Sequence, residues 1–92
     1  MQDIQRLRKR IDGIDENILQ LLGERSEICR SIGILKKEQG IPIIDTFREN
    51  EVFSNIRVKA TDFGLDANQV EAIYRQIVNM CSSVQDLKEK TE

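Results

Sequence analysis

The sequence of 92 residues is long enough for one domain, 1–92, but a domain of this size buries little apolar surface, so association with a second copy is expected. Sixteen acidic and fourteen basic residues nearly balance, which excludes the strong overall field of proteins that bind nucleic acid or anionic membranes. No stretch approaches the roughly 20 apolar residues that span a bilayer, and the charged start does not resemble a secretory signal, so we expect a soluble, cytoplasmic protein.

The residue types that most often support metal or acid–base chemistry are scarce. Histidine is absent, and the two cysteines, Cys29 and Cys81, lie far apart in the sequence without a paired spacing. We therefore expect no disulfide framework, no thiolate metal site and no cofactor.

A first helix is predicted over residues 3–39, and Gly40 with Pro42 ends it. Its apolar residues alternate by three and four positions, as in a heptad seam. The seam comprises Ile4, Leu7, Ile11, Ile14, Ile18, Leu21, Arg25, Ile28, Ile32 and Leu35. Such a helix extends about 55 Å, and two short helices cannot cover it. We therefore predict an intertwined homodimer of long helices, although a plain coiled-coil interaction module would show the same pattern.

Arg25 interrupts this seam and requires an anion, because an arginine removed from water without a partner is costly. An ion pair with Glu24, with Glu27 or with an acid of a neighbouring helix would satisfy it, as would contact with solvent. Lys36 lies on the same side of the helix about 16 Å away, so the two side chains could hold a small anion. Arg8 is about 25 Å from Arg25 and can approach it only from a second, antiparallel chain; taken alone, it is an ordinary surface charge.

A second helix is predicted over residues 46–62. It begins at Asp45 or Thr46, because Thr46 and Glu49 have the spacing of a capping box. Asp45, Arg48 and Glu49 share a face, and capping together with first-turn charge is a sufficient reason for these residues. The buried residues expected here are Val52, Phe53 and Ile56.

A third helix is predicted over residues 67–88 and is capped by Asp66. One side of it is expected to be apolar, and the chain is therefore predicted to be all-α, with one long and two shorter helices. Cys81 and Gln85 continue this side one turn apart. Gln85 offers an amide where a hydrophobic residue would be less costly, unless it marks the edge of the core, and Cys81 is equally a small buried hydrophobe. The expected apolar side comprises Val70, Ile73, Tyr74, Ile77, Met80, Cys81 and Val84.

These polar residues lie in segments that resemble the all-helical class of chorismate mutase over nearly the whole chain. Residues 7–15 resemble the family's opening, in which Arg8 matches the arginine that crosses to the partner's site. Residues 24–25 resemble its glutamate–arginine pair. Residues 33–36 resemble the glycine, two-residue gap and lysine that supply its catalytic lysine.

The most specific segment is residues 41–49, which resembles the family's proline turn followed by aspartate, two residues, arginine and glutamate. In the third helix the family has a small polar residue and, one turn later, a glutamine or glutamate; Cys81 and Gln85 hold these positions. Cysteine in place of the more usual serine departs from the family, and a thiol is a weaker hydrogen bonder than a hydroxyl. Ser82 is not expected to replace it, because adjacent helix positions point about 100° apart.

The resemblance implies a cofactor-free enzyme that converts chorismate to prephenate in phenylalanine and tyrosine biosynthesis. In this intramolecular [3,3] rearrangement an ether C–O bond breaks while a C–C bond forms. Its enzyme holds a flexible dicarboxylate in a folded conformer and stabilises charge on the ether oxygen. The implied catalytic residues are Lys36, Gln85 and Arg25, and the implied substrate-binding residues are these three with Asp45, Arg48, Glu49, Cys81 and the partner copy's Arg8.

The resemblance also implies a task for each of these side chains. The two arginines Arg8 and Arg25 would bind the two carboxylates bidentately. Lys36 and Gln85 would donate hydrogen bonds to the ether oxygen. Arg48, Glu49 and Cys81 would orient the ring hydroxyl or the pyruvyl carboxylate. Asp45 would either position Lys36 or cap the second helix.

Two alternatives stay open at this point. An isochorismate pyruvate lyase has the same helical dimer and a similar anion site, but the lyases tend to lose the glutamate that Glu49 matches. A non-catalytic helical dimerisation or regulatory domain would require the polar positions to be ion pairs.

Overall fold

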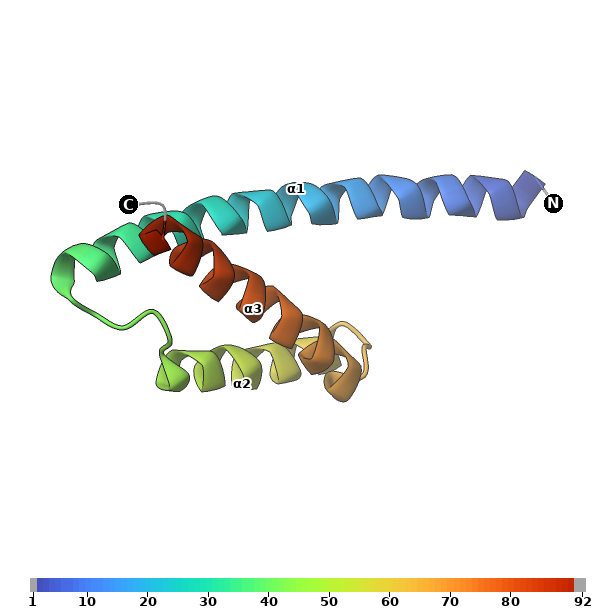
Figure 1. The fold of residues 1–92 in the computed structure, drawn as a ribbon. Coiled ribbons are helices and arrows are strands. Elements are labelled where there is room, and N and C mark those ends of the chain that lie inside the picture. Colours follow the sequence, from blue (N-terminus) through green and yellow to red (C-terminus); the bar gives the residue numbers. More distant parts are fainter. Residues whose placement is uncertain (1, 91–92) are drawn as a thin grey trace.

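The computed structural model describes residues 2–90 of the chain and the side chains of residues 3–85. It is all-α, with helices α1 (Gln2–Gln39), α2 (Thr46–Asp62) and α3 (Ala67–Lys90) (Figure 1). The three predicted helices are confirmed, each boundary to within two residues. Over this described part of the chain, none of the helices is both long and apolar enough to cross a membrane.

Polar caps and glycines mark ends of all three helices. Asp45 Oδ1 accepts a hydrogen bond from the Arg48 N–H at 2.9 Å, so Asp45 is the N-cap of α2. Asp66 Oδ1 accepts in the same way from the Gln69 N–H at 2.9 Å at the start of α3. Gly40 and Gly64 adopt φ values of 66° and 72°, a left-handed conformation that only glycine adopts at little cost.

Helix α3 packs against both α1 and α2, and it crosses from α2 to the C-terminal half of α1 (Figure 1). The core between them is small: Cys29, Phe53, Ala60 and Val78 are its buried hydrophobic residues. Of these, Phe53 was predicted from the periodicity, whereas Ala60 and Val78 were not. Ile73 and Met80, which were expected on the apolar side of α3, are exposed instead. The apolar side of α3 is wider than the surface that α1 and α2 cover.

Two arginines and one glutamate join α2 to α3 on the outside of the core. Arg57 of α2 donates to Glu71 Oε1 at 2.9 Å, and Arg75 of α3 donates to Glu71 Oε2 at 2.6 Å. The Arg75 guanidinium also lies 4.4 Å from the centre of the Phe53 ring. This cluster therefore fixes the two short helices as one unit.

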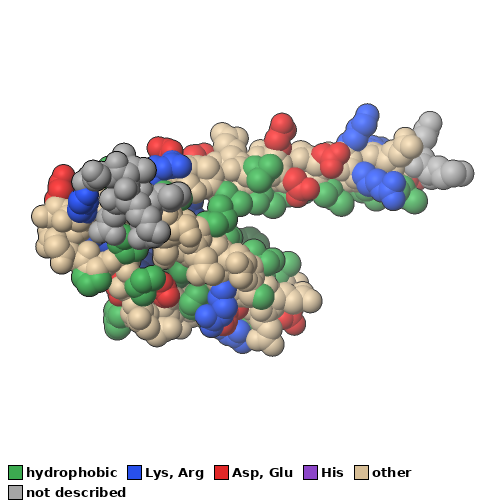
Figure 2. Space-filling view, in the orientation of Figure 1, with side chains coloured by type: hydrophobic (Ala, Val, Ile, Leu, Met, Phe, Trp, Pro, Cys, Tyr) green, Lys and Arg blue, Asp and Glu red, His purple; other side chains and the backbone are tan. Residues whose placement is uncertain are grey.

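The N-terminal half of α1 extends as an arm beyond the other two helices (Figure 1). The chain measures 56 × 28 × 14 Å and has a radius of gyration of 16.5 Å, against about 12 Å for a compact chain of this length. Apolar side chains line one side of the arm (Figure 2), and the seam residues Ile4 to Ile18 are 48% to 55% exposed. The rest of the described chain leaves this apolar seam uncovered.

The expectation of no disulfide is wrong. Cys29 of α1 and Cys81 of α3 form a disulfide, with their Cα atoms 5.4 Å apart. Their separation of 52 residues along the chain gave no sign of this, because the crossing of α1 and α3, and not the spacing, brings them within the usual disulfide range.

Candidate active site

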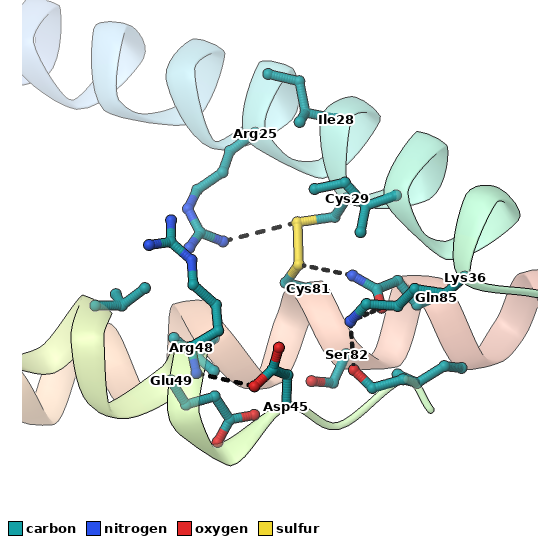
Figure 3. A pocket seen from close by; sticks show the side chains of 14 residues that line it. Arg25, Ile28, Cys29, Lys36, Asp45, Arg48, Glu49, Cys81, Ser82 and Gln85 are labelled. Atoms are coloured by element: carbon teal, nitrogen blue, oxygen red, sulfur yellow. Dashed lines mark hydrogen bonds between the residues drawn. A yellow bond between two sulfur atoms is a disulfide. The ribbon is translucent and has the colours of Figure 1, made fainter. Parts of the chain in front are cut away.

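A cavity of about 440 Å³ is lined by residues of all three helices, a volume that suits a small organic molecule (Figure 3). Seven of the eight residues predicted from the sequence line it. The eighth, Arg8, is exposed on the arm of α1, far from the cavity. The lining residues are Arg25, Ile28, Cys29, Ile32, Lys36, Ile43, Asp45, Arg48, Glu49, Val52, Val78, Cys81, Ser82 and Gln85.

Lys36 projects into the cavity from the last turn of α1, where a cation also interacts favourably with the helix dipole. Its Nζ donates to the backbone oxygen of Ile43 at 2.6 Å and to Gln85 Oε1 at 3.3 Å. An ammonium group has three N–H donors. Two are therefore used within the chain, and one is left for a ligand.

Gln85 is the buried polar residue of the site, with 4% of its surface exposed. Its Oε1 accepts from Lys36, and its Nε2 donates to Cys81 Sγ at 3.3 Å. These contacts explain why an amide is tolerated here, since each of its two ends has a partner. The second hydrogen of Nε2 provides a further donor at the cavity wall.

Gly33 makes the position of Gln85 possible. From the sequence, Gly33 was indicated only as part of a family motif. A Cβ atom at Gly33 would lie 2.8 Å from Gln85 Cγ and 3.0 Å from Gln85 Cα. Any larger residue would therefore push α3 and its glutamine away from α1. The close approach also places Gln85 beside Lys36, which lies three residues further along α1.

Arg25 has no acidic partner among the residues that the structure describes. Its Nη1 lies 3.8 Å from Cys29 Sγ, a weak acceptor. Glu27, one of the two expected partners on the same helix, pairs with Arg30 instead. The internal ion pair considered from the sequence is therefore not formed among the residues described, and the guanidinium is available to a bound anion.

The first turn of α2 forms the opposite wall of the cavity. Arg48 points across it toward Arg25 (Figure 3), and its Nη1 also donates to Glu51 Oε1 at 2.7 Å at the exposed rim. Asp45 caps the helix, which confirms one of the two roles considered for it. Glu49 is half-buried and lines the cavity.

Cys81 and Ser82 both line the cavity, so the expectation that Ser82 points away from it is wrong. Their side chains do diverge by about 100°, but α3 forms a wall between α1 and α2, and the cavity extends over both directions. The Cys81 sulfur is bonded to Cys29 and carries no hydrogen to donate. The hydroxyl of Ser82 is therefore the small polar donor that α3 provides here.

The charges of the lining favour an anion. Arg25, Lys36 and Arg48 provide three cations, against the carboxylates of Asp45 and Glu49. No group of three or more potential metal ligands occurs among the described residues. The arrangement provides several hydrogen-bond donors around a partly apolar cavity, as expected of a site that binds and orients a small carboxylate.

These features define a class of small all-α proteins, in which one long and two short helices surround a cationic cavity. The chain belongs to the chorismate mutase type II family, whose sequence model matches residues 7–86.

Three comparisons place it among known proteins. It is 38% identical over 88 residues to a bifunctional chorismate mutase/prephenate dehydratase of Aquifex aeolicus, covering 92% of this chain and 24% of that protein. It is 29% identical over 85 residues to a chorismate mutase of Methanocaldococcus jannaschii, covering 92% and 86%. A solved structure of a conserved hypothetical protein from Pyrococcus furiosus is 35% identical and superimposes with a TM-score of 0.73 over 92% and 97% of the two chains. The chain thus spans about a quarter of the length of the Aquifex relative.

Proposed function

We propose that this cavity binds chorismate and catalyses its intramolecular rearrangement to prephenate. The observation that carries the proposal is the convergence of Arg25, Lys36, Arg48 and Gln85, from three helices, on one cavity in which no described residue gives Arg25 an acidic partner. A dicarboxylate supplies the missing negative charge. Family membership and the name of the Methanocaldococcus relative support the same reaction.

The α1 wall and the α2 wall of the cavity bind different ends of the substrate in this proposal. Arg25 binds one carboxylate of chorismate as a planar, bidentate donor. Arg48 and Glu49, on the facing wall, orient the second polar end of the molecule, either the ring hydroxyl or the pyruvyl carboxylate. Held from both sides, the flexible substrate is kept in the folded conformer in which its two reacting carbons are close.

Lys36 and Gln85 act on the bond that breaks. As the ether C–O bond lengthens, negative charge develops on its oxygen, and preorganised donors stabilise that charge more in the transition state than in the ground state. The remaining N–H of Lys36 and the second N–H of Gln85 Nε2 serve as these donors. No proton is transferred and no covalent bond to the protein forms, so the chain needs no nucleophile or general base.

The functional unit in this proposal is an intertwined homodimer. The exposed seam on the arm of α1 is long enough to pack along the arm of a second copy, and its burial would remove a large apolar area from water. An antiparallel arrangement would carry Arg8 of one copy to the Arg25 region of the other, where it would bind the second substrate carboxylate. The cavity of a single chain lacks this arginine.

The test is incubation of the purified protein with chorismate while the loss of its absorbance is followed. A mutase converts chorismate into an isomer of equal mass and releases no pyruvate. Pyruvate release from isochorismate would instead identify the lyase, and no acceleration of either reaction would support a non-catalytic dimerisation domain. The Lys36→Ala protein is the matched control for contaminating activity.

A further inference from the structure

The Cys29–Cys81 disulfide joins two walls of the cavity. Cys29 belongs to α1 and Cys81 to α3, and both residues line the cavity (Figure 3). The bond is therefore part of the surface that a ligand meets. Its chemical state decides what the neighbouring site residues contact.

Each sulfur lies against a donor of the site one helical turn away. Arg25 Nη1 is 3.8 Å from Cys29 Sγ, and Gln85 Nε2 donates to Cys81 Sγ at 3.3 Å. A sulfur in a disulfide has no hydrogen and can only accept, whereas a thiol can accept or donate. In the closed state the Nε2 end of Gln85 thus faces sulfur and its Oε1 end faces Lys36. Opening the bond removes this restriction and frees both cysteine rotamers.

The next turn keeps the helices together when the bond is open. Gly33 and Gln85 follow the two cysteines by four residues, and a Cβ at Gly33 would be 2.8 Å from Gln85 Cγ. The missing side chain at Gly33 lets α1 and α3 pack closely at this turn, independently of the disulfide. Opening the disulfide therefore changes the cavity wall locally and leaves the crossing of α1 and α3 in place.

We propose that Cys29 and Cys81 form a redox-responsive modification site in the cavity wall: closed, the disulfide holds Arg25 and Gln85 in position for a bound dicarboxylate, and a dithiol reductant that opens it weakens the site. The kinetic part of this inference rests on the proposed function. Cys81 is half-buried and Cys29 is only 4% exposed, so the reductant's thiolate attacks Cys81 Sγ. A mixed disulfide forms and Cys29 leaves as a thiolate, which takes up a proton. The reductant's second thiol then displaces Cys81, so that two electrons pass to the cysteines and the reductant becomes a disulfide.

The first experiment determines the state of the cysteines in the purified protein. The denatured protein is alkylated with iodoacetamide before and after treatment with dithiothreitol. Without prior reduction we expect no carbamidomethyl group on the protein, and after reduction we expect two. Labelling of both cysteines without reduction would overturn the proposal.

The second experiment compares kcat/KM for chorismate in the oxidised and the fully reduced protein. We expect reduction to lower it about tenfold, equivalent to about 1.4 kcal/mol, because two long side chains must then be ordered on binding. Reoxidation is expected to restore it. The Cys29→Ser/Cys81→Ser variant is the matched control: its kcat/KM should equal that of the reduced protein and should not respond to reductant. An unchanged kcat/KM in fully reduced wild-type protein would overturn the proposal.

A binding probe separates this inference from the proposed function. Malonate is a small dicarboxylate whose affinity, measured by titration calorimetry, does not depend on turnover. We expect its Kd to rise about fivefold on reduction of the wild type and not to respond to reductant in the double serine variant. A protein that binds malonate in this redox-dependent way but does not convert chorismate would refute the function alone. Equal malonate affinity in both states would refute the redox site.

Discussion

At the scale of single residues, the site depends on pairs of donors whose geometry is set by neighbours. Lys36 illustrates this, because the Ile43 oxygen and Gln85 Oε1 occupy two of its three N–H groups and thereby aim the third. Gln85 in turn is held by Lys36 and by Cys81. Such preorganisation is what electrostatic stabilisation of a transition state requires.

Lys36→Ala is expected to reduce kcat by about 10²–10³, the usual effect of removing one preorganised donor to developing charge. KM should change much less, because the interaction strengthens in the transition state. Steady-state kinetics at several chorismate concentrations measure both parameters. A rise in KM with unchanged kcat would show that Lys36 binds the ground state and does not assist bond breaking.

Gln85→Glu is expected to make the activity dependent on pH. The amide of glutamine donates a hydrogen bond at any pH, whereas a glutamate must be protonated before it can donate. The wild type should therefore change little between pH 6 and 9, while the variant should lose activity steadily as the pH rises. The two pH profiles of kcat provide the comparison, and parallel profiles would argue against donation by this side chain.

Gly33→Ala tests the close approach that positions Gln85. The added methyl group would lie 2.8–3.0 Å from three atoms of Gln85, and overpacking of this kind costs about 1–3 kcal/mol. We expect kcat to fall about tenfold or more, since small displacements of catalytic groups are costly.

Gly23→Ala is the matched control for that variant. Gly23 is exposed and a Cβ there meets no atom within 4 Å, so the change should leave kcat as it is and stabilise α1 by about 1 kcal/mol. Equal kinetic effects of the two substitutions would indicate that Gly33 does not position the glutamine.

At the scale of helices, the sequence predicted what depends on local patterns. Asp45, Asp66 and Gly40 mark helix ends through capping and a left-handed backbone conformation, and both effects act within a few residues. The face shared by Arg25 and Lys36 followed in the same way from helix geometry. These features could therefore be predicted before any tertiary arrangement was known.

The features that were missed all depend on how helices cross. The Cys29–Cys81 disulfide and the role of Gly33 arise because α1 and α3 approach closely at one crossing point. Ser82 lines the cavity because α3 forms a wall between two neighbours. Periodicity within one helix gives the direction of a side chain but not the distance to another helix, so none of the three could be predicted from it.

The charge cluster between α2 and α3 predicts a dependence of stability on pH. Hydrogen bonds from Arg75 and Arg57 lower the pKa of Glu71 below its ordinary value of 4.5. Because folding lowers this pKa, the Glu71 carboxylate stabilises the folded state at pH values above the unfolded-state pKa. This stabilisation is lost as the pH falls through the folded-state pKa. Glu71→Gln should therefore lower Tm at pH 7, and the difference from the wild type should shrink below pH 4.5. Thermal unfolding by circular dichroism over pH 3–7 measures this, and a constant difference would contradict it.

At the scale of the whole molecule, the arm of α1 is the feature that a single chain does not explain. Its apolar seam is about half exposed from Ile4 to Ile18, and exposed apolar surfaces of this extent mark interaction sites. Arg8 lies on the same arm, remote from a cavity in which Arg25 has no acidic partner among the described residues. The proposed dimer would account for both features, because arms that lie along each other would cover the apolar seam and bring Arg8 of one copy to the cavity of the other.

A mixing experiment tests this arrangement. Arg8→Ala should mainly raise KM, because it removes a ground-state contact, whereas Lys36→Ala should mainly reduce kcat. If sites are shared, a dimer with one copy of each variant contains one site with both residues intact. Random exchange makes about half of the dimers mixed, so the mixture should recover about one quarter of the wild-type activity.

The control pair separates shared sites from other causes of recovery. Lys36 and Gln85 belong to the same site of one chain, so mixed dimers of Lys36→Ala and Gln85→Ala contain no intact site and should recover nothing. One variant of each mixture is labelled with ¹⁵N, because Lys36→Ala and Gln85→Ala have almost the same mass, and native mass spectrometry of the dimers then verifies subunit exchange in both mixtures. Recovery with Arg8→Ala but not with Gln85→Ala requires that an arginine crosses between chains. Exchange without recovery in either mixture would mean that each chain binds its substrate alone, and that the arm serves dimerisation only.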